Sequence, residues 1–440
     1  MANIRFGMAG LGRLGYRHAE NIAFRTPGAE LAAVCSVVPG ELVRAAQSFP
    51  RAARYADYGE MLKHEGLDAI FLCTPSGLHV AQIEAGLKAG FHVFSEKPLG
   101  VTVAECEHAE QVVAAHPNQV FMLGFMRRYD PPYAYAKRLI DEGRIGKSFM
   151  VRAYGLDPEA LVQGAIKFAP TSGGIFLDMA VHDIDLANWY LGGTPASVWA
   201  IGGAFVHPEF VEFGDCDNAC AMFQYKDGGM AFLYVGRTAP HGYHIETEII
   251  GTKGTLRVSP VPQKNLVQIF NSDGVLQECV GGFLESFESA YLNELHEFVD
   301  CIRQGRKPDV HAEDGTAATR IAFAATESYR ERRIVAENLL TANPNLKGIF
   351  ATNDEMALGA ANAAKSAGKT LVIVGFDATN DALKAIEDGS MSGSVAQFPT
   401  KIGELGTLTA AKVARGEKVD AFVNTGVEVV SKDNLSNFMK

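Results

Sequence analysis

The stretch that decides the fold is IRFGMAGLGRLG at residues 4–15, an apolar run that ends in three spaced glycines. YRHAENI at residues 16–22 then reads as the beginning of a helix. A strand, a glycine-rich turn and a helix in this order are typical of a dinucleotide-binding unit. In such a unit Gly10 permits the tight turn, Gly12 lets the backbone approach a pyrophosphate, and Gly15 lets the helix pack against the strand.

The helix N-terminus after the glycines is the predicted pyrophosphate site. Its free N–H groups, from Gly12, Arg13 and Leu14 onward, and the helix dipole both favour an anion there. The alternative is a glycine-rich turn that holds no ligand. The strand–turn–helix context favours the nucleotide, so the leading hypothesis is an enzyme that transfers hydride to or from a nicotinamide cofactor.

Composition restricts the classes of protein that remain. The 440 residues suggest about three domains. The net charge of −11 disfavours partners such as nucleic acid or an anionic membrane. No apolar run approaches the roughly 18 residues of a membrane span, and Met1 runs directly into the first strand, so no signal peptide is expected. Seven cysteines without a disulfide pattern favour a reduced, cytoplasmic protein.

Residues 3–123 alternate strands and helices, which predicts a parallel sheet covered on both faces. The second strand, residues 30–36, ends where an Asp or Glu normally holds the adenosine ribose. Here that place is Cys35-Ser36, which has no carboxylate, and no Arg follows directly. Ser36 is therefore a predicted cofactor contact, and the choice of cofactor stays open: NAD is favoured and NADP is possible.

Three further strands, residues 67–73, 90–95 and 120–125, end in polar residues. Ligands of α/β proteins bind at this carboxyl edge. The predicted cofactor contacts at the edge are Thr74, Pro75, His79, Glu96, Lys97 and Arg127. A Lys beside a nucleotide site is a candidate acid or electrostatic catalyst, whereas elsewhere a solvated surface Lys would be the better interpretation.

From about residue 145 longer strands follow one another with short turns, KDGG at residues 226–229 and GTKG at residues 251–254. This pattern predicts an open antiparallel sheet with one apolar face free for a partner subunit.

Residues 175–189 read as a helix within that second domain. Asp178 and His182 are four residues apart and project from one face. The His can accept a hydroxyl proton while the carboxylate orients either the His or the substrate. A solvated helix start is the bland alternative. A metal site with Asp185 ranks last, because no second His- or Cys-rich cluster completes a shell, and the pair Cys216 and Cys220 reads as structural.

Residues 3–335 resemble the Gfo/Idh/MocA family of nicotinamide-dependent oxidoreductases. The resemblance rests on ordered motifs: residues 9–15, Thr74-Pro75, Glu96-Lys97-Pro98, Gly173-Gly174 with Asp178 and His182, residues 251–255 and Glu313-Asp314-Gly315. Within the family, residues 124–130 and 174–185 look most like inositol 2-dehydrogenases.

The resemblance implies a catalytic group of Lys97, Asp178 and His182. His182 would take the proton of the reacting ring hydroxyl, Lys97 would steady the oxyanion, and Asp178 would help hold the substrate. The implied substrate contacts are these three residues with Arg127 and Asp157. Residues 154–158, YGLDP, look closer to scyllo- than to myo-inositol dehydrogenases, so the polyol stays open, and a dimer or tetramer is implied.

Residues 336–440 have a different composition. Up to Val335 there are 20 Arg and 10 Lys, and afterwards there are one Arg and nine Lys. The tail resembles the end of a ribose-type periplasmic sugar-binding protein, whose sugar-bonding positions correspond to Asn353, Asp377 and Gln397. The first lobe of such a protein is missing, so we expect no useful sugar affinity and interpret the tail as a fusion or deletion product. A truncated sheet also exposes an edge, with a risk of aggregation.

The prediction is therefore an α/β chain of three parts: a Rossmann NAD(P)-binding domain (1–125), an α+β substrate and oligomerisation domain with a large open antiparallel sheet (126–335), and a partial sugar-binding lobe (336–440). Its predicted function is oxidation of a ring hydroxyl of myo- or scyllo-inositol. The alternatives are a dehydrogenase of another sugar and a carbohydrate sensor without turnover. Intact Lys97, Asp178 and His182 favour the enzyme, because a sensor does not need all three.

Overall fold

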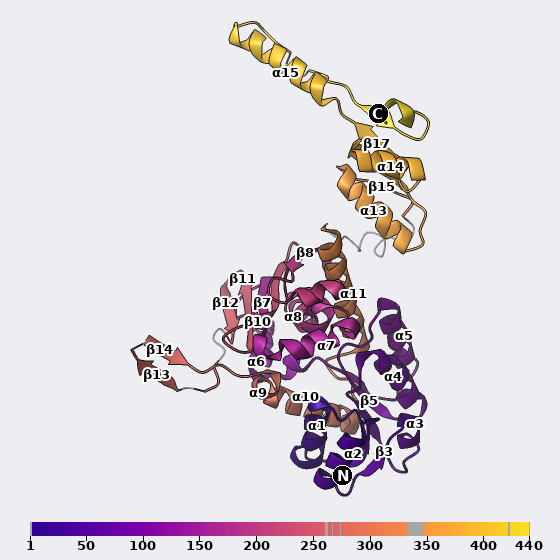
Figure 1. Ribbon diagram of the computed structural model, residues 1–440, viewed down its shortest axis with the longest axis vertical. Helices are drawn as coiled ribbons and strands as arrows, with labels where there is room; N and C mark the ends of the chain where they lie inside the picture. Colours follow the sequence, from indigo (N-terminus) through magenta and orange to yellow (C-terminus); the bar gives the residue numbers. More distant parts are fainter. Residues whose placement is uncertain are drawn as a thin grey trace. The chain divides into compact units, whose positions relative to one another are not determined.

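The computed structural model describes residues 2–259, 263–265, 267–272, 274–332, 346–420 and 423–439. The chain divides into two compact units, residues 1–332 and 333–440 (Figure 1). The predicted boundary between residues 335 and 336 lies outside the described residues.

A six-stranded parallel sheet forms the first part of unit 1, in the order β3-β2-β1-β4-β5-β6. The order reverses between β1 and β4, and ligands of such sheets bind at the carboxyl ends beside that switch point. The strands are β1 Ile4–Ala9, β2 Ala29–Cys35, β3 Ala53–Tyr55, β4 Ala69–Leu72, β5 His92–Glu96 and β6 Phe121–Gly124. The connecting helices are α1 Arg13–Glu20, η1 Asn21–Arg25, α2 Pro39–Ser48, α3 Tyr58–Met61, η2 Ser76–Leu78, α4 His79–Lys88 and α5 Val103–Ala114. The Rossmann prediction is confirmed.

The central strand β4 is apolar along both faces, as expected where both faces of a sheet are covered, and every residue of β4 is buried. The rings of Phe71 and Phe94 stack with centroids 4.1 Å apart. Phe298, from helix α10 (Glu288–Gln304) late in the unit, lies 5.7 Å from Phe94 in an edge contact. Helix α10, near the end of unit 1, thus packs against the core of the parallel sheet at its beginning.

The second sheet of unit 1 has the order β12-β11-β7-β10-β9-β8. Its strands are β7 Ser148–Pro158, β8 Pro195–Gly203, β9 Asn218–Tyr225, β10 Met230–Ala239, β11 His244–Gly251 and β12 Gly254–Val258. The turns at residues 226–229 and 251–254 join strands as predicted. One pair departs from the antiparallel prediction: β7 and β10 are parallel. The chain leaves β7 through helices and returns by way of β8 and β9, so β10 enters beside β7 in the same direction.

The remaining elements of unit 1 are helical, except for β13 and β14, which pair in a separate two-stranded sheet that projects away from the second sheet (Figure 1). They are η3 Met126–Tyr129, α6 Pro131–Asp141, η4 Glu159–Leu161, α7 Val162–Ser172, η5 Phe176–Ala180, α8 Val181–Leu191, η6 Pro208–Phe213, β13 Gln268–Asn271, β14 Gly274–Gln277, α9 Phe283–Ser286 and α11 Ala312–Glu331. The helix predicted at residues 175–189 is therefore a π-helical turn followed by α8. In the part of the chain that the structure describes, no helix is long and apolar enough to cross a membrane.

Unit 2 has its own four-stranded sheet, in the order β15-β16-β17-β18, and its own buried cluster around Ile373, Leu383 and Ile386. Its elements are β15 Gly348–Phe350, α13 Asp354–Ser366, β16 Val372–Asp377, α14 Asn380–Asp388, β17 Gly393–Ala396, α15 Pro399–Ala414, β18 Glu428–Val430 and η7 Leu435–Asn437. Helix α15 buries none of its residues and leaves the apolar side chains of Leu408 and Val413 exposed.

Candidate active site

A cavity of about 580 Å³ in unit 1 is lined from both sheets. It collects all five predicted substrate contacts: Lys97 after β5, Arg127 in η3, Asp157 in β7, Asp178 in η5 and His182 in α8. A cavity of this size suits a small-molecule ligand. The predicted catalytic residues therefore come together at one place.

Lys97 and Asp178 are in contact through the backbone of Asp178. Lys97 Nζ donates to the Asp178 carbonyl oxygen at 2.9 Å. The carboxylate of Asp178 instead accepts from Nη2 of the buried Arg237, at 3.2 Å, and the same Nη2 lies 3.6 Å from Asp215. Arg237, not His182, therefore holds the Asp178 carboxylate. The sequence predicted that this carboxylate orients either His182 or the substrate. In the structure it does not bond His182.

His182 is almost fully buried, and its surroundings disfavour the imidazolium. Burial lowers the pKa of His182 well below its ordinary value, and the positive charges of Lys97 and Arg127 lower it further. A neutral imidazole in this position is able to accept a proton. Burial, together with the charge of Asp178, raises the pKa of Asp157 to about 6.

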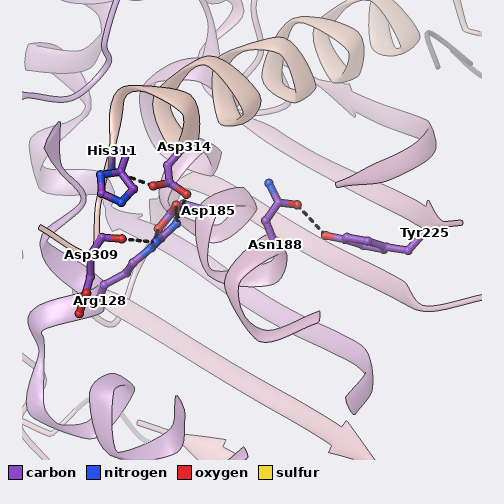
Figure 2. A network of polar contacts seen from close by, with 7 residues as sticks. All are labelled: Arg128, Asp185, Asn188, Tyr225, Asp309, His311 and Asp314. Atoms are coloured by element: carbon purple, nitrogen blue, oxygen red, sulfur yellow. Dashed lines mark hydrogen bonds and ion pairs between the residues drawn. The ribbon is translucent and has the colours of Figure 1, made fainter. Parts of the chain in front are cut away.

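Helix α8 turns its other carboxylates away from the cavity. Asp183 Oδ1 accepts from Arg127 at 2.6 Å. Asp185 accepts from Arg128 Nε at 2.9 Å, and Arg128 also bonds Asp314 and the carbonyl of Asp309 (Figure 2). The grouping of Asp185 with Asp178 and His182 around a metal is therefore wrong, because Asp185 is engaged in this arginine network.

The same network gives a structural role to the predicted motif at residues 313–315. Asp314 accepts from the backbone N–H of His311 at 2.8 Å and so caps α11, while its other oxygen bonds Arg128 (Figure 2). A side chain at Gly315 would lie 2.6 Å from Leu123. This motif fastens α11 to η3 and α8, which carry cavity residues.

The three glycines of the opening turn have different surroundings. A Cβ at Gly10 would lie 2.2 Å from the carbonyl oxygen of Cys73, and one at Gly15 would lie 2.1 Å from that of Gly10. A Cβ at Gly12 would meet nothing within 4 Å. Gly10 and Gly15 thus serve close packing, and Gly12 leaves an open face at the N-terminus of α1. Such a face fits a dinucleotide pyrophosphate.

Arg13 and Leu14, which follow this turn, line the 580 Å³ cavity, and Arg13 with Gly12 also lines a second, open pocket. The nucleotide-binding turn therefore adjoins the predicted catalytic residues. Ser36, at the end of β2, is buried and bonds Glu41 of α2.

The predicted cofactor contacts at the ends of β4 and β5 differ in exposure and in their hydrogen-bond partners. Thr74 is half-buried and Pro75 is exposed. His79 is buried, with its ring nitrogens 2.9 Å from the Thr74 carbonyl oxygen and 2.7 Å from that of Pro98. Both ring nitrogens of His79 thus face backbone carbonyl oxygens, and the neutral ring donates to one of the two. The role of His79 as a cofactor contact stays a prediction.

Glu96 belongs to a buried polar cluster beneath Lys97. Its Oε1 lies 2.9 Å from His18 Nε2, and its Oε2 accepts from the Lys97 N–H at 3.2 Å. Glu294 of α10 completes a group whose ligand-type atoms all lie within 4.8 Å of one another. Burial and the charge of Glu96 raise the pKa of Glu294 well above its ordinary value, which favours a proton on Glu294. The absence of a metal stays a prediction.

Sequence reasoning missed several residues of the cavity. Arg237, Tyr243 and Tyr291 line it or hold its residues, and η4 and α7 supply Ala160, Leu161 and Gly164. Arg237 lies near the end of β10 in a strand read only for its apolar pattern. Tyr291 lies in α10. No local motif marks either residue.

Comparison with known proteins assigns both units. Residues 4–125 match the model described as an oxidoreductase family with an NAD-binding Rossmann fold, and residues 133–257 match the GFO/IDH/MocA C-terminal domain. Residues 292–418 match a periplasmic binding protein domain.

Individual relatives agree with the family models. The scyllo-inositol 2-dehydrogenase (NAD(+)) of Bacillus subtilis is 34% identical over 329 residues, which is 74% of this chain and 94% of that protein. The myo-inositol 2-dehydrogenase of Thermotoga maritima is 31% identical over 333 residues, 76% of this chain and 98% of that protein. The scyllo-inositol dehydrogenase from Lactobacillus casei, solved with NAD(H) and scyllo-inositol, superposes with a TM-score of 0.73 at 44% identity and covers 76% of this chain and 98% of that chain.

The cavity unites an open nucleotide-binding turn with a lysine, a neutral histidine and a held carboxylate, and both halves of unit 1 match one family. The chain belongs to the Gfo/Idh/MocA family of oxidoreductases as an NAD-dependent dehydrogenase, and it carries a periplasmic-binding-protein domain at its C-terminal end.

Proposed function

We propose that the protein oxidises a ring hydroxyl of a cyclic polyol, scyllo- or myo-inositol, by hydride transfer to NAD. The observation that carries the proposal is the meeting of Lys97, Asp157, Asp178 and His182 in a cavity that Arg13 and Leu14 of the nucleotide-binding turn also line. Bound NAD supplies the acceptor for the hydride that leaves the substrate carbon.

His182 is the proposed general base. Its imidazole is neutral at physiological pH, because burial and two neighbouring cations lower its pKa. It takes the proton of the hydroxyl whose carbon is oxidised. Lys97 lies in the same cavity and stabilises the negative charge that develops on the oxygen as the proton leaves.

The carboxylates of Asp157 and Asp178 are the proposed holders of neighbouring hydroxyls. Both line the cavity, and Asp178 is fixed from behind by Arg237. A carboxylate offers only acceptors, so each orients a polyol O–H group, and a ring that carries several hydroxyls satisfies both. Arg127, held by Asp183, lies at the same wall and keeps the surroundings of His182 positive.

The first experiment measures initial rates of NADH formation with scyllo- and myo-inositol, and with an aldose as a third substrate. Scyllo-inositol is the first candidate, supported by the run YGLDP at residues 154–158 and by the 44% identity to the scyllo-inositol dehydrogenase from Lactobacillus casei. Turnover of either inositol supports the proposal. Turnover of the aldose alone, or of none of the three, would contradict it.

We also propose that the enzyme is a dimer or tetramer through the open face of its second sheet. The large side chains Trp199, Ile201, Met222 and Met230 of β8, β9 and β10 are between 42% and 52% exposed. Apolar side chains gathered on one face favour a partner subunit. Light scattering of the wild type and of Trp199→Glu tests this: a smaller particle in the variant is expected, and equal masses would contradict it.

A cytoplasmic location is the final part of the proposal. The seven cysteines are free thiols in the structure, which suits a reducing compartment.

A further inference from the structure

An open pocket of about 500 Å³ adjoins the nucleotide-binding turn and shares Arg13 with the catalytic cavity. Gly12 and Tyr16 line it from the turn and α1, and Glu41 and Arg44 line it from α2. In a Rossmann domain, the adenosine ribose is read at the end of the second strand, beside the glycine-rich turn. The pocket is therefore the place where NAD and NADP are distinguished, because they differ only at the ribose 2′ position.

The second strand ends without a carboxylate, but a carboxylate is held there by a hydrogen bond. Ser36 Oγ donates to Glu41 Oε2 at 2.6 Å and accepts from the Val38 N–H at 3.0 Å. Ser36 itself is buried, and its backbone N–H donates to the Tyr55 carbonyl at 3.1 Å. Ser36 is thus a fixed support, and the acidic group comes from the first turn of α2, five residues later in the chain.

We propose that Glu41 selects NAD over NADP and that Ser36 is its positioning residue. The inference rests on the assignment of NAD as cofactor. Glu41 is half-buried, and its Oε1 accepts no hydrogen bond from any residue that the structure describes, so this oxygen is free for the ribose 2′-OH. A 2′-phosphate at the same place meets a like charge and loses binding free energy.

Two arginines, Arg13 and Arg44, line the pocket beside Glu41, so the charge of Glu41 determines whether the pocket favours a hydroxyl or a phosphate. Arg44 lies with Cζ 3.7 Å from the centre of the Tyr16 ring and donates to the Leu11 carbonyl at 2.9 Å. Arg13 lies with Cζ 4.6 Å from the centre of the Phe283 ring. Without the negative charge of Glu41, these two guanidinium groups leave a cationic pocket that suits a phosphate.

The test measures dissociation constants of NADH and NADPH for the full-length protein by titration of nucleotide fluorescence, which needs no turnover. The wild type is expected to prefer NADH. Glu41→Gln is expected to shift the ratio of the two constants toward NADPH by about tenfold or more, since the repulsion of a doubly charged phosphate is removed. Ser36→Ala shifts the ratio in the same direction by less, because the carboxylate stays but loses its support.

Glu110→Gln, which neutralises a carboxylate on α5 away from the pocket, is the matched control and leaves the ratio unchanged. An unchanged ratio in Glu41→Gln, or a wild type that prefers NADPH, overturns the inference. If the wild type prefers NADH and Glu41→Gln loses that preference, the inference is supported, even if the enzyme turns over no inositol. The outcome for Glu41 is thus separate from the outcome for the proposed substrate. Binding of neither nucleotide overturns both.

Discussion

The two units of the chain each contain polar residues that the sequence predicts for a sugar or polyol site, but they arrange them differently. In unit 1, Lys97 in the loop after β5 lines one cavity together with Asp157, Asp178 and His182, which come from three different elements. In unit 2, Gln397 Nε2 donates to Asp377 Oδ1 at 2.7 Å, and Asn353 accepts from the Met356 N–H at 2.9 Å as the cap of α13.

The comparison shows that a motif identifies residues, whereas the surrounding elements decide what those residues do. In unit 1, burial perturbs the titration of Asp157 and His182, as is typical of groups with a chemical task. In unit 2, Asp377 is exposed and its partner is a side chain of its own unit. The polar side chains of this incomplete site in unit 2 therefore bond one another or water.

The largest effect is expected from Lys97→Ala, which removes the ammonium group from the unit 1 cavity. The turnover number should fall by about 10²-fold or more, the range found for acid–base and electrostatic groups, with a smaller change in KM. Initial rates of NADH formation measure it. Lys307→Ala, at an exposed lysine, is the control. Near-normal turnover of Lys97→Ala would contradict the assignment of the active site to this cavity.

Glu294→Gln is expected to stabilise the protein at neutral pH. The pKa of Glu294 is raised in the folded state, so the wild type is favoured below the unfolded pKa and loses stability as pH rises above it. The amide cannot ionise, so its advantage grows with pH, to about 1–3 kcal/mol, the cost of an unsatisfied buried group. Urea unfolding at pH 4.5 and pH 8 measures the difference. A difference in stability that shrinks toward pH 8 would contradict the assignment.

A smaller effect is expected from the titration of Asp157. Its pKa is about 6, so its carboxylate is ionised at pH 7.5 and protonated at pH 5. Protonation weakens its hydrogen bond to a polyol hydroxyl, and KM for inositol should rise about fivefold as the pH falls. The KM of Asp157→Asn should not change with pH over this interval. If the variant keeps the wild-type profile, another group is responsible.

The smallest effect is expected in unit 2. The triple variant Asn353→Ala, Asp377→Ala, Gln397→Ala should leave the KM for inositol within about 1.5-fold of wild type, because none of the three residues lines the unit 1 cavity and independent sites have little influence on one another. Calorimetric titration of the wild type with inositol should show one binding event, which the triple variant retains. A second binding event that is seen in the wild type and lost in the triple variant would show that unit 2 binds inositol. The difference drawn here between the two units would then be wrong.

The sequence predicted those features that local pattern determines. The strand–glycine–helix unit, the strand ends with Glu96 and Lys97, and the spacing of Asp178 and His182 are all visible within short windows. Long-range partners were not visible. Nothing near Asp178 indicates that Arg237, 59 residues away, holds its carboxylate, and Asp185 shares a helix face with Asp178 in the pattern but is engaged by Arg128.

The parallel pairing of β7 with β10 was missed for a similar reason. Short turns were read as antiparallel connections throughout, which holds for β9 with β10 and for β11 with β12. The place of β7 in the sheet depends on strands that are added about 80 residues later. A strand pattern specifies which face is buried but not which neighbour a strand takes.

The empty space beside Gly12 has a consequence for how this sequence changes over time. An alanine at Gly10 or Gly15 collides with backbone atoms, so selection for a folded chain alone maintains those two positions. An alanine at Gly12 meets no protein atom within 4 Å, and the fold tolerates it. Only a molecule bound against the turn makes the methyl group harmful. A lineage that ceased to use the nucleotide would therefore be free to drift at Gly12 while Gly10 and Gly15 stayed fixed.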